Sequence, residues 1–505
     1  MTETVAKPRS RFRVIFLAPV LAFIALAAWA YASPIGAAPD DDYHLVSIWC
    51  ANGGSAECTP GTEANTRVLP ESFRGIACYA QVESRSAQCQ HAVLNDKTPV
   101  ELDRGNFAGE YPPVYYAAMR LFAGDDIQVS ALAMRLVNAA LFVALGTALA
   151  ILLPAYRRRT LLWGWLVSLV PLGMFLIPSN NPSGWAITGV GTAFLALLGW
   201  FETTGRRRWA LGALYLLGVL MAAGSRGDAA VYAIGATGTV LILASARTRA
   251  FAISTMLPVA GLILAFVFFA SAGQSGVASS GFTSGGGGAT IPVPGATGVE
   301  APLTGFALAA YNILMLPFLW TGVWGSWGLG WLDTQLPGIV PWAATAAFIA
   351  VGFAGLGLLT WRKAIATGGV LLVLIVLPVY VLTAGGDKVG ANLQPRYLLP
   401  LIVLFVFLLL TEPAGGRLKL TRVQTFAILA ALAVANLVSL QVDIRRYVTG
   451  AAQQGLNLDD GAAWWWPNLP VGPSAVWVIG ALAYAGLLAV LWSQLRRRDD
   501  VRLDA

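Results

Sequence analysis

Long apolar runs of about 20 residues, separated by short polar segments, recur along the whole 505-residue chain. A transmembrane helix needs about 20 mostly apolar residues to cross a hydrocarbon core about 30 Å thick. The pattern therefore predicts an all-α polytopic membrane protein with about twelve transmembrane helices. The runs lie near residues 14–32, 129–153, 160–178, 183–201, 209–224, 228–246, 251–272, 338–360, 364–384, 397–412, 423–441 and 473–494.

Clusters of Lys and Arg between the runs predict the orientation of the chain, because these residues favour the cytoplasmic side of a membrane. With both termini in the cytoplasm and twelve crossings, the cytoplasmic segments hold 21 of the 33 Lys and Arg residues. The same segments hold only 6 of the 26 Asp and Glu residues. We therefore expect both termini to be cytoplasmic.

One further run, residues 304–320, complicates this count. If it crossed the membrane, all later basic clusters would move outside, so we interpret it as a re-entrant or interfacial helix. A thirteenth crossing is the alternative. The first run could also be a signal peptide, although its apolar stretch is longer than usual and a retained helix is favoured.

This topology divides the chain into five parts. They are a cytoplasmic N-terminus with the first helix (1–32), an extracytoplasmic loop (33–128), helices 2–7 (129–272), a Gly-rich extracytoplasmic loop with the re-entrant or interfacial helix (273–337), and helices 8–12 with an outer loop at 442–472 and a cytoplasmic C-terminus (338–505).

The composition agrees with a membrane protein and excludes several other classes. Hydrophobic residues make up 57% of the chain and charged residues only 12%, about half the charged fraction of a typical soluble protein. A cytosolic enzyme, a secreted module and a nucleic-acid-binding domain are excluded. The net charge of +7 reflects topology, so the expected partner is the lipid bilayer and not nucleic acid.

All four cysteines lie in the first outer loop: Cys50, Cys58, Cys78 and Cys89. An even number confined to an oxidising compartment predicts two disulfides. Three pairings are open, and Cys50–Cys58 with Cys78–Cys89 is the simplest. A zinc site that also uses His44 and His91 is the competing interpretation, but the chain lacks the CxxC spacing typical of such sites.

Three consecutive carboxylates, Asp40 to Asp42, follow the first helix immediately and precede His44. Adjacent carboxylates repel one another, so the pKa of at least one should rise unless a cation compensates. Such a cluster suits a general base that deprotonates an acceptor hydroxyl, with Asp41 or Asp40 as the candidates. It also suits an oxygen-rich site for a divalent cation such as Mg²⁺, Mn²⁺ or Ca²⁺. A solvated acidic loop that caps the helix is the plain alternative.

Candidate groups for a phosphate lie near the start of a late helix. Lys388 and Arg396 flank a short loop that ends in Gln394, Pro395, Arg396 and Tyr397. Guanidinium groups bind phosphate oxygens in bidentate fashion, and charges near hydrocarbon are usually retained for a partner. An ion pair between Arg396 and a carboxylate is the structural alternative. For Arg226, an ion pair with Asp228 is favoured.

Two other motifs contain candidate substrate-binding residues. Tyr111 lies in an aromatic and proline-rich stretch, Glu110 to Tyr116, that opens a short interfacial helix. Asp333 is an isolated carboxylate among aromatic residues near the end of the second outer loop. It could form a turn or accept hydrogen bonds from sugar hydroxyls, and the sequence does not separate these roles.

These motifs together resemble a bacterial membrane family known as domain of unknown function 2142. The matching pieces occur in the family's order and span most of the chain. They are Pro39-Asp40-Asp41 with His44, Tyr111-Pro112-Pro113 with Tyr115-Tyr116, Gly330 to Asp333 with Leu336-Pro337, and Gln394 with Arg396 to Pro400.

That family is similar to the GT-C superfamily, whose members are integral glycosyltransferases that use polyprenyl-phosphate sugars on the outer face of the membrane. The resemblance implies an essential acidic residue at Asp40 or Asp41. The family usually has Asp-Glu followed by Pro there, whereas this chain has Asp41 and Asp42 in the last two places. The departure leaves open which carboxylate is the base.

The leading hypothesis is therefore an inverting glycosyltransferase of a bacterial plasma membrane with an extracytoplasmic active site. Its donor would be a polyprenyl-phosphate sugar held near Arg396 and Lys388, and its acceptor a cell-wall polysaccharide or glycolipid. His44, Tyr111, Asp333, Gln394 and Tyr397 are the candidate substrate-binding residues. A lipid-carrier flippase or transporter and a non-catalytic envelope-assembly protein are the alternatives. No P-loop or Rossmann fingerprint occurs in the cytoplasmic segments.

Overall fold

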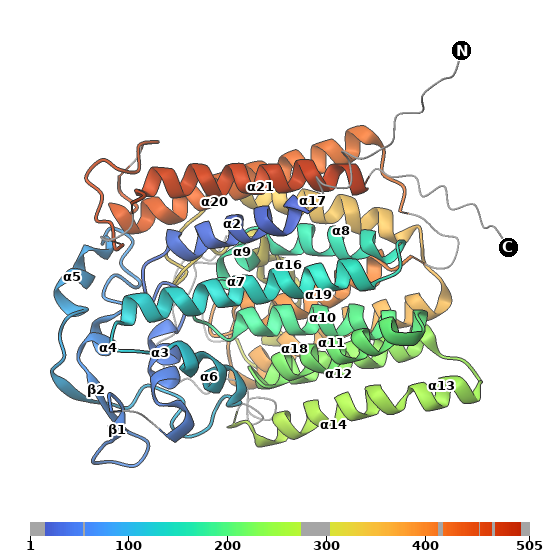
Figure 1. Ribbon diagram of the computed structural model, residues 1–505, viewed down its shortest axis with the longest axis horizontal. Coiled ribbons are helices and arrows are strands. Elements are labelled where there is room, and N and C mark those ends of the chain that lie inside the picture. Colours follow the sequence, from blue (N-terminus) through green and yellow to red (C-terminus); the bar gives the residue numbers. More distant parts are fainter. Residues whose placement is uncertain are drawn as a thin grey trace.

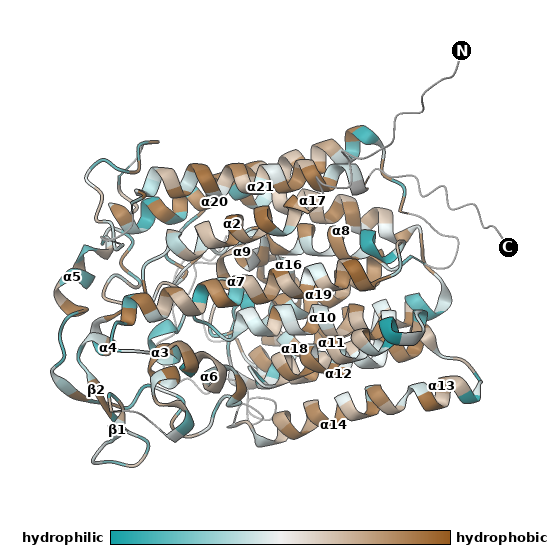
Figure 2. Cartoon of the chain, viewed as in Figure 1, coloured by the Kyte–Doolittle hydropathy of each residue, from teal (hydrophilic) through white to brown (hydrophobic). Residues whose placement is uncertain are grey.

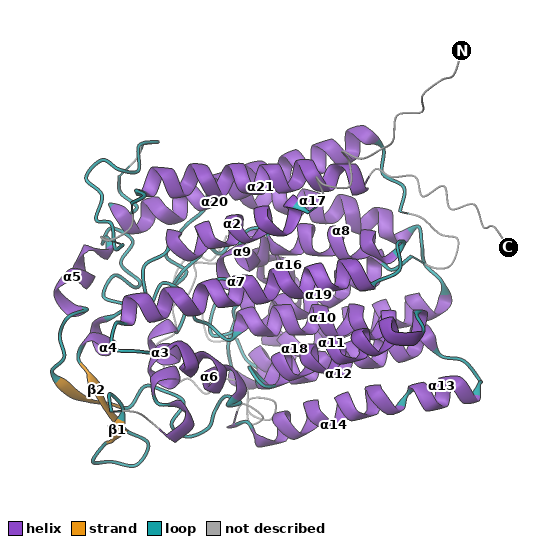
Figure 3. Ribbon diagram, in the orientation of Figure 1, coloured by secondary structure: helices purple, strands orange, loops and turns teal. Residues whose placement is uncertain are grey.

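The computed structural model describes residues 16–53, 56–273, 303–412, 418–453, 455–466 and 470–495. Long helices lie side by side in a bundle, and a smaller domain of short helices and strands covers one end of it (Figures 1 and 3). We call this smaller domain, residues 33–126, the loop domain, and the opposite end of the bundle the far end. The Gly-rich stretch at 284–288 lies outside the described residues.

The bundle helices are apolar over most of their length, whereas polar residues gather at the turns and in the loop domain (Figure 2). They are α2 (Leu17–Ala32), α7 (Ile127–Leu152), α8 (Arg157–Leu169), α9 (Leu172–Leu176), α10 (Ser183–Glu202), α11 (Gly205–Ala223), α12 (Gly227–Ala244), α13 (Arg249–Ser254), α14 (Met256–Ser271), α16 (Gly305–Thr321), α17 (Ile339–Leu356), α18 (Trp361–Gly385), α19 (Pro395–Leu410), α20 (Arg422–Val448) and α21 (Pro473–Leu495).

Nine helical segments in the described residues are long and apolar enough to cross a membrane by length and composition, including eight of the twelve predicted runs. The described parts of α2 and α19 are shorter, at 16 residues each. The run at 160–178 is divided between α8 and α9, with Pro171 at the break. Helix α11 carries three arginines in its first turn, Arg206 to Arg208. Polytopic helical architecture is therefore established, and a count of twelve is not.

The ninth segment is Gly305–Trp324, which includes the run interpreted as re-entrant or interfacial. Near its start, the Asn312 side chain bonds the Asp387 carbonyl and the Val389 amide, just after α18 ends. After the helix, Trp331 donates from Nε1 to the Gly36 carbonyl in the loop domain. Contacts on both sides of α16 therefore lie at the loop-domain end, which is the path that a re-entrant segment requires.

Helix α10 forms the centre of the bundle and packs against α7, α11, α12 and α19. Small residues allow these close contacts: a Cβ at Gly189 would lie 2.5 Å from the Ala222 nitrogen of α11, and one at Gly218 would lie 2.7 Å from the Ala193 nitrogen. Nearly all of α10 is consequently buried inside protein, so its apolar composition serves packing against neighbouring helices.

The loop domain combines a small antiparallel sheet with four short helices. The strands are β1 (Thr59–Pro60), β2 (Arg67–Pro70) and β3 (Pro99–Leu102), with β2 in the middle. The helices are α3 (Asp41–Trp49), α4 (Ser72–Gly75), α5 (Gln90–Val93) and α6 (Val114–Met119). Disulfides join Cys50 to Cys58 and Cys78 to Cys89, which confirms two disulfides in the simplest of the three pairings.

Candidate functional site

The chain between α2 and α3 is fixed by a buried arginine of α7. Arg135 donates to the carbonyls of Ala30, Ser33 and Pro34 at 2.7–3.1 Å, and from Nε to Asn180 Oδ1 at 2.8 Å. The last carbonyls of a helix lack partners within the helix. Arg135 supplies them here, so the acidic segment that follows α2 starts from a fixed position.

Asp40 lies between two guanidinium groups that come from distant parts of the chain. Arg396, in the first turn of α19, pairs with Asp40 Oδ2 and donates to the Pro39 carbonyl at 2.9 Å. Arg104 of the loop domain donates to Asp40 Oδ1 at 2.8 Å and to Asp42 Oδ2 at 2.7 Å. The structure therefore brings together the acidic cluster and Arg396, which the sequence analysis placed in one site.

The charge state of Asp40 follows from these neighbours. Burial alone would raise its pKa, but the positive charges of Arg396 and Arg104 outweigh burial and hold the pKa well below its ordinary value. Its side chain retains 32% exposure, whereas that of Arg396 retains 3%. Asp40 is therefore an ionised and partly accessible carboxylate.

Asp41 has the opposite environment. Its side chain is fully buried, with Oδ2 3.7 Å from Arg135 Nη2 and 3.3 Å from the Ala38 amide. Oδ1 has no hydrogen-bond partner within the described part of the chain. Burial, opposed by the charge of Arg135, raises the pKa of Asp41 to about 7. The expectation that Asp41 meets Arg396 is thus wrong, because Asp40 makes that contact and Asp41 turns inward.

The difference arises in the backbone at Asp40, the residue that precedes the first turn of α3. Asp40 has φ 60° and ψ 20°, in the left-handed region. Aspartate tolerates that region better than most residues. Two adjacent carboxylates are thereby directed to different partners, one on α19 and one on α7.

Aromatic rings form a wall around Asp40 and Arg396. The Tyr397 ring lies 4.8 Å from the guanidinium carbon of Arg396 and 4.7 Å from that of Arg226. The Tyr111 ring lies 6.0 Å from the guanidinium carbon of Arg226. Arg226 itself is paired with Asp228 through two hydrogen bonds of 2.9 and 2.8 Å, as the sequence favoured.

His44 stands next to this wall, on the first turn of α3. Its ring lies 5.3 Å from the Tyr111 ring, and its Nδ1 is 2.9 Å from the Tyr116 hydroxyl. Burial lowers the pKa of His44 well below its ordinary value, against the opposing charge of Asp40. The imidazole is therefore neutral at pH 7 and can exchange a hydrogen bond with a hydroxyl group.

Three of the candidate residues contribute less directly. Lys388 lies against the Tyr311 ring, 5.3 Å from its centre, next to α16. Asp333 is buried in an ion pair with Arg446 at 2.7 Å and accepts from the Gln81 amide, so it joins α20 to the loop domain. Neither lies in the Asp40 cluster in its described contacts. Gln394 precedes α19, with its Oε1 buried and unpartnered within the described residues.

A cavity of about 550 Å³ adjoins the cluster on the loop-domain side. Asp42 and Arg104 belong both to the Asp40 cluster and to the cavity lining. The other lining groups include the hydroxyls of Thr62 and Thr66 and the carboxylate of Glu101. Charged and hydroxyl groups beside an exposed carboxylate can hold a polyhydroxylated ligand.

Arg104 is the main residue of the site that the sequence analysis did not select. It lies in an irregular segment without periodicity or a recognisable motif, so only its position beside Asp40 and Asp42 reveals it. Over the described ranges, no group of three or more His, Cys, Asp or Glu side chains could hold a metal ion. The carboxylates of the cluster are instead neutralised by arginine.

Comparison with known proteins identifies a family. The model of the family described as "Predicted membrane protein (DUF2142)" matches residues 23–405, which include the acidic cluster and Arg396. No curated protein matches the chain, and no solved structure matches it. The protein therefore belongs to the DUF2142 family of predicted membrane proteins, whose description names no activity.

Proposed function

We propose that this member of the family is a glycosyltransferase that moves a sugar from a polyprenyl-phosphate donor to a cell-envelope glycan or lipid. The observation that carries the proposal is the contact between Asp40 and Arg396, 356 positions apart in the chain, at the loop-domain end of an apolar bundle. A partly exposed carboxylate next to a fixed guanidinium provides both the base and the phosphate site that this transfer needs.

The arginines would bind the phosphate of the donor. Arg396 and Arg104 already hold an anion, the Asp40 carboxylate, and phosphate oxygens offer the same kind of acceptor. An arriving phosphate would compete with Asp40 for these guanidinium groups. The exchange would release Asp40 from two positive charges, raise its pKa, and make it a better base beside the bound donor.

The reaction then balances within the cluster. The acceptor oxygen attacks the anomeric carbon, the bond from that carbon to the phosphate oxygen breaks, and the acceptor proton moves to Asp40. The lipid phosphate leaves with the electron pair, and the sugar is inverted. Negative charge grows on the leaving phosphate, so preorganised Arg396 and Arg104 stabilise the transition state more than the ground state.

The acceptor would approach through the adjoining cavity of about 550 Å³. Its hydroxyl and carboxylate groups suit sugar hydroxyls, and Asp42 and Arg104 connect it to Asp40. The aromatic rings of Tyr111 and Tyr397 offer apolar faces for the donor sugar. In this arrangement Asp41 has no direct chemical task, because it is fully buried.

The proposed orientation places the loop domain outside a bacterial plasma membrane and both chain termini in the cytoplasm. Two disulfides in the loop domain support an oxidising compartment on that side. Basic residues such as Arg157, Arg208 and Arg362 lie at the far end, as the positive-inside rule requires of a cytoplasmic face.

The test uses the purified full-length chain in liposomes with synthetic polyprenyl-phosphate sugars and an envelope extract as acceptor. Release of lipid phosphate together with glycan labelling is expected for the wild type. Asp40→Asn should remove both signals, whereas Asp125→Asn, an exposed acid outside the cluster, should retain them. Lipid movement across the bilayer without any bond cleavage would instead support a flippase and overturn the transferase proposal.

A further inference from the structure

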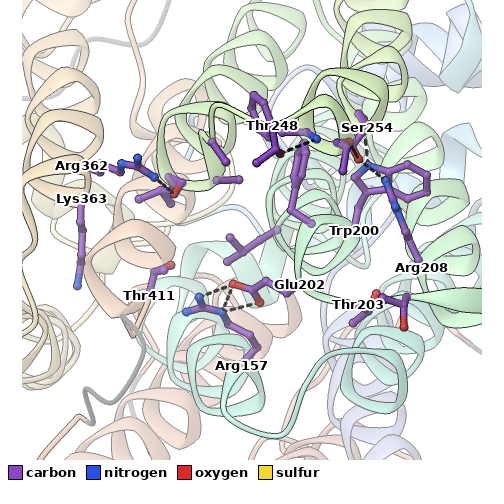
Figure 4. Close-up of a pocket in the computed structure, with 18 of the residues that line it drawn as sticks. Arg157, Trp200, Glu202, Thr203, Arg208, Thr248, Ser254, Arg362, Lys363 and Thr411 are labelled. Atoms are coloured by element: carbon purple, nitrogen blue, oxygen red, sulfur yellow. Dashed lines mark hydrogen bonds and ion pairs between the residues drawn. The ribbon is translucent and has the colours of Figure 1, made fainter.

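A second cavity of about 550 Å³ lies at the far end of the bundle, away from the Asp40 cluster. It is bounded by the ends of α8, α10, α12, α18 and α19 and by α13 (Figure 4). Four of its lining residues are basic and two are acidic. They are Arg157, Arg208, Arg362 and Lys363, against Glu202 and Glu412.

The two acidic groups do not balance the four cations. Glu202 forms a multiply hydrogen-bonded ion pair with Arg157, as the dashed lines in Figure 4 show. The Glu412 side chain accepts from the Leu418 backbone amide at 3.0 Å. The lining therefore carries an excess of two positive charges, and Arg157 is the cation whose charge is directly neutralised.

The remaining cations contact oxygens without formal charge. Arg208 donates to Ser254 Oγ at 2.6 Å and stacks over the Trp200 ring at 4.0 Å, while its Nε is buried and lacks a partner within the described residues. Arg362 donates to the Ser245 carbonyl at 2.6 Å. Lys363 donates to the Leu409 carbonyl at 2.6 Å. These bonds orient the cations without cancelling their charge.

Hydroxyl groups add neutral donors to the same lining. Thr203, Thr248 and Thr411 are among them, and Figure 4 shows these side chains distributed around the space between the cations. Charged forks and hydroxyls that converge on a space of this size are the groups that bind phosphate oxygens.

Exposed tryptophans flank this cavity and point to where a ligand would come from. Trp209 on α11 is 69% exposed and lies 5.2 Å from the Trp200 ring, and Trp361 on α18 is 68% exposed and lies 5.3 Å from the Arg362 guanidinium. Exposed tryptophan at the end of a membrane helix is typical of the headgroup level. Basic pockets between helices at that level bind phosphate headgroups.

We infer that the far-end cavity binds a phosphate-bearing anion, held by Arg208 and Arg362 and supported by Lys363. This site is distinct from the proposed transferase site, since the two lie at opposite ends of the bundle, and it does not depend on the transferase proposal. The phosphate belongs either to an anionic lipid headgroup or to a soluble phosphate compound, and the experiment below separates the two.

The experiment uses the purified full-length chain and native mass spectrometry with added phosphatidylglycerol or phosphatidylcholine. The wild type should retain phosphatidylglycerol in preference. The double variant Arg208→Gln/Arg362→Gln should lose about 10-fold or more in apparent affinity for that lipid, since each removed cation weakens the attraction of a phosphate headgroup. In parallel, inorganic pyrophosphate is titrated while Tm is followed by tryptophan fluorescence.

A matched control removes the same charge from the same end of the bundle. Arg158→Gln/Arg249→Gln alters two exposed arginines that do not line the cavity, so its affinity should stay within about 2-fold of wild type. Restoring charge with Arg208→Lys/Arg362→Lys should recover most of the binding, which distinguishes a site defect from misfolding.

The outcomes separate cleanly. Selective loss of phosphatidylglycerol binding in the Gln double variant supports a lipid headgroup. A rise in wild-type Tm with pyrophosphate, absent from the Gln double variant and without lipid preference, supports a soluble phosphate compound. Equal loss in both double variants, or no binding of either probe, overturns the site.

Discussion

Two adjacent carboxylates of one turn have opposite environments, and the contrast between them separates chemistry from architecture. Asp40 is partly exposed and held by Arg396 and Arg104, which come from separate elements. Asp41 is fully buried and faces Arg135, which also bonds the end of α2. Each carboxylate faces an arginine from a bundle helix, but only the Asp40 pair can exchange its arginine for a ligand.

The contrast explains why accessibility is a better guide here than a shifted pKa. Burial raises the pKa of Asp41 to about 7, a value that suits a general base, yet no cavity in the described residues reaches it. The pKa of Asp40 lies well below its ordinary value only while its arginines are unoccupied by another anion. A bound phosphate would reverse this order.

The largest expected effect comes from removing the exposed carboxylate. Asp40→Asn keeps the size of the side chain but cannot accept a proton, so transfer should fall by about 10²–10⁴-fold, the usual contribution of a general base. The measurement is single-turnover release of lipid phosphate in liposomes. Tm should change little, since the site is partly exposed. Activity near wild type would show that Asp40 is not the base.

Removing the buried arginine should act on folding. Arg135→Met leaves Asp41 without its cation and three carbonyls without their donor. Loss of one partner of a buried ion pair destabilises a protein by about 3–5 kcal/mol. Tm in detergent and the yield of monodisperse protein should fall together. A stable variant that loses only transfer would assign Arg135 to the chemistry.

A smaller effect is expected from Arg396→Lys, which keeps the charge and loses the fork. The Lys side chain can reach only part of the set formed by Asp40, the Pro39 carbonyl and Tyr397. We expect the donor kcat/KM to fall by about 10–100-fold, with most of the loss in donor KM and little change in acceptor KM. An unchanged donor KM would remove the phosphate assignment.

The sequence predicted the membrane class, the disulfides and the meeting of the acidic cluster with Arg396, because these depend on residue type and order. It could not choose between Asp40 and Asp41, since adjacent carboxylates are chemically alike and the backbone at Asp40 decides which way each points. Lys388 and Asp333 were grouped with the site by chemistry alone. In the fold they contact α16 and α20 instead.

The number of crossings shows a similar limit of sequence patterns. Hydropathy treats 160–178 as one run, yet the structure divides it between α8 and α9 with Pro171 at the break, where proline removes a backbone donor. Arg104 was missed because irregular loops have no periodicity to interpret. Long-range pairing is decided by tertiary packing, which local patterns do not encode.

The smallest expected effect tests the buried carboxylate through pH. The native pKa of Asp41, about 7, exceeds the ordinary value of 3.8, so the native state binds more protons than the unfolded state between these values. Stability should therefore fall as pH rises through this window and level off above it. Between pH 6 and pH 8 the contribution is about 1.4 kcal/mol for one group with a pKa near 7.

Asp41→Asn should abolish this loss, because the amide has no proton to release. Its Tm should gain on that of the wild type from pH 6 to pH 8, whereas Asp125→Asn should follow the wild type throughout. Transfer at pH 7 should persist in Asp41→Asn, which is the reverse of the result for Asp40→Asn. If Asp41→Asn instead abolished transfer while Tm stayed independent of pH, the chemical and structural roles of the two carboxylates would have to be exchanged.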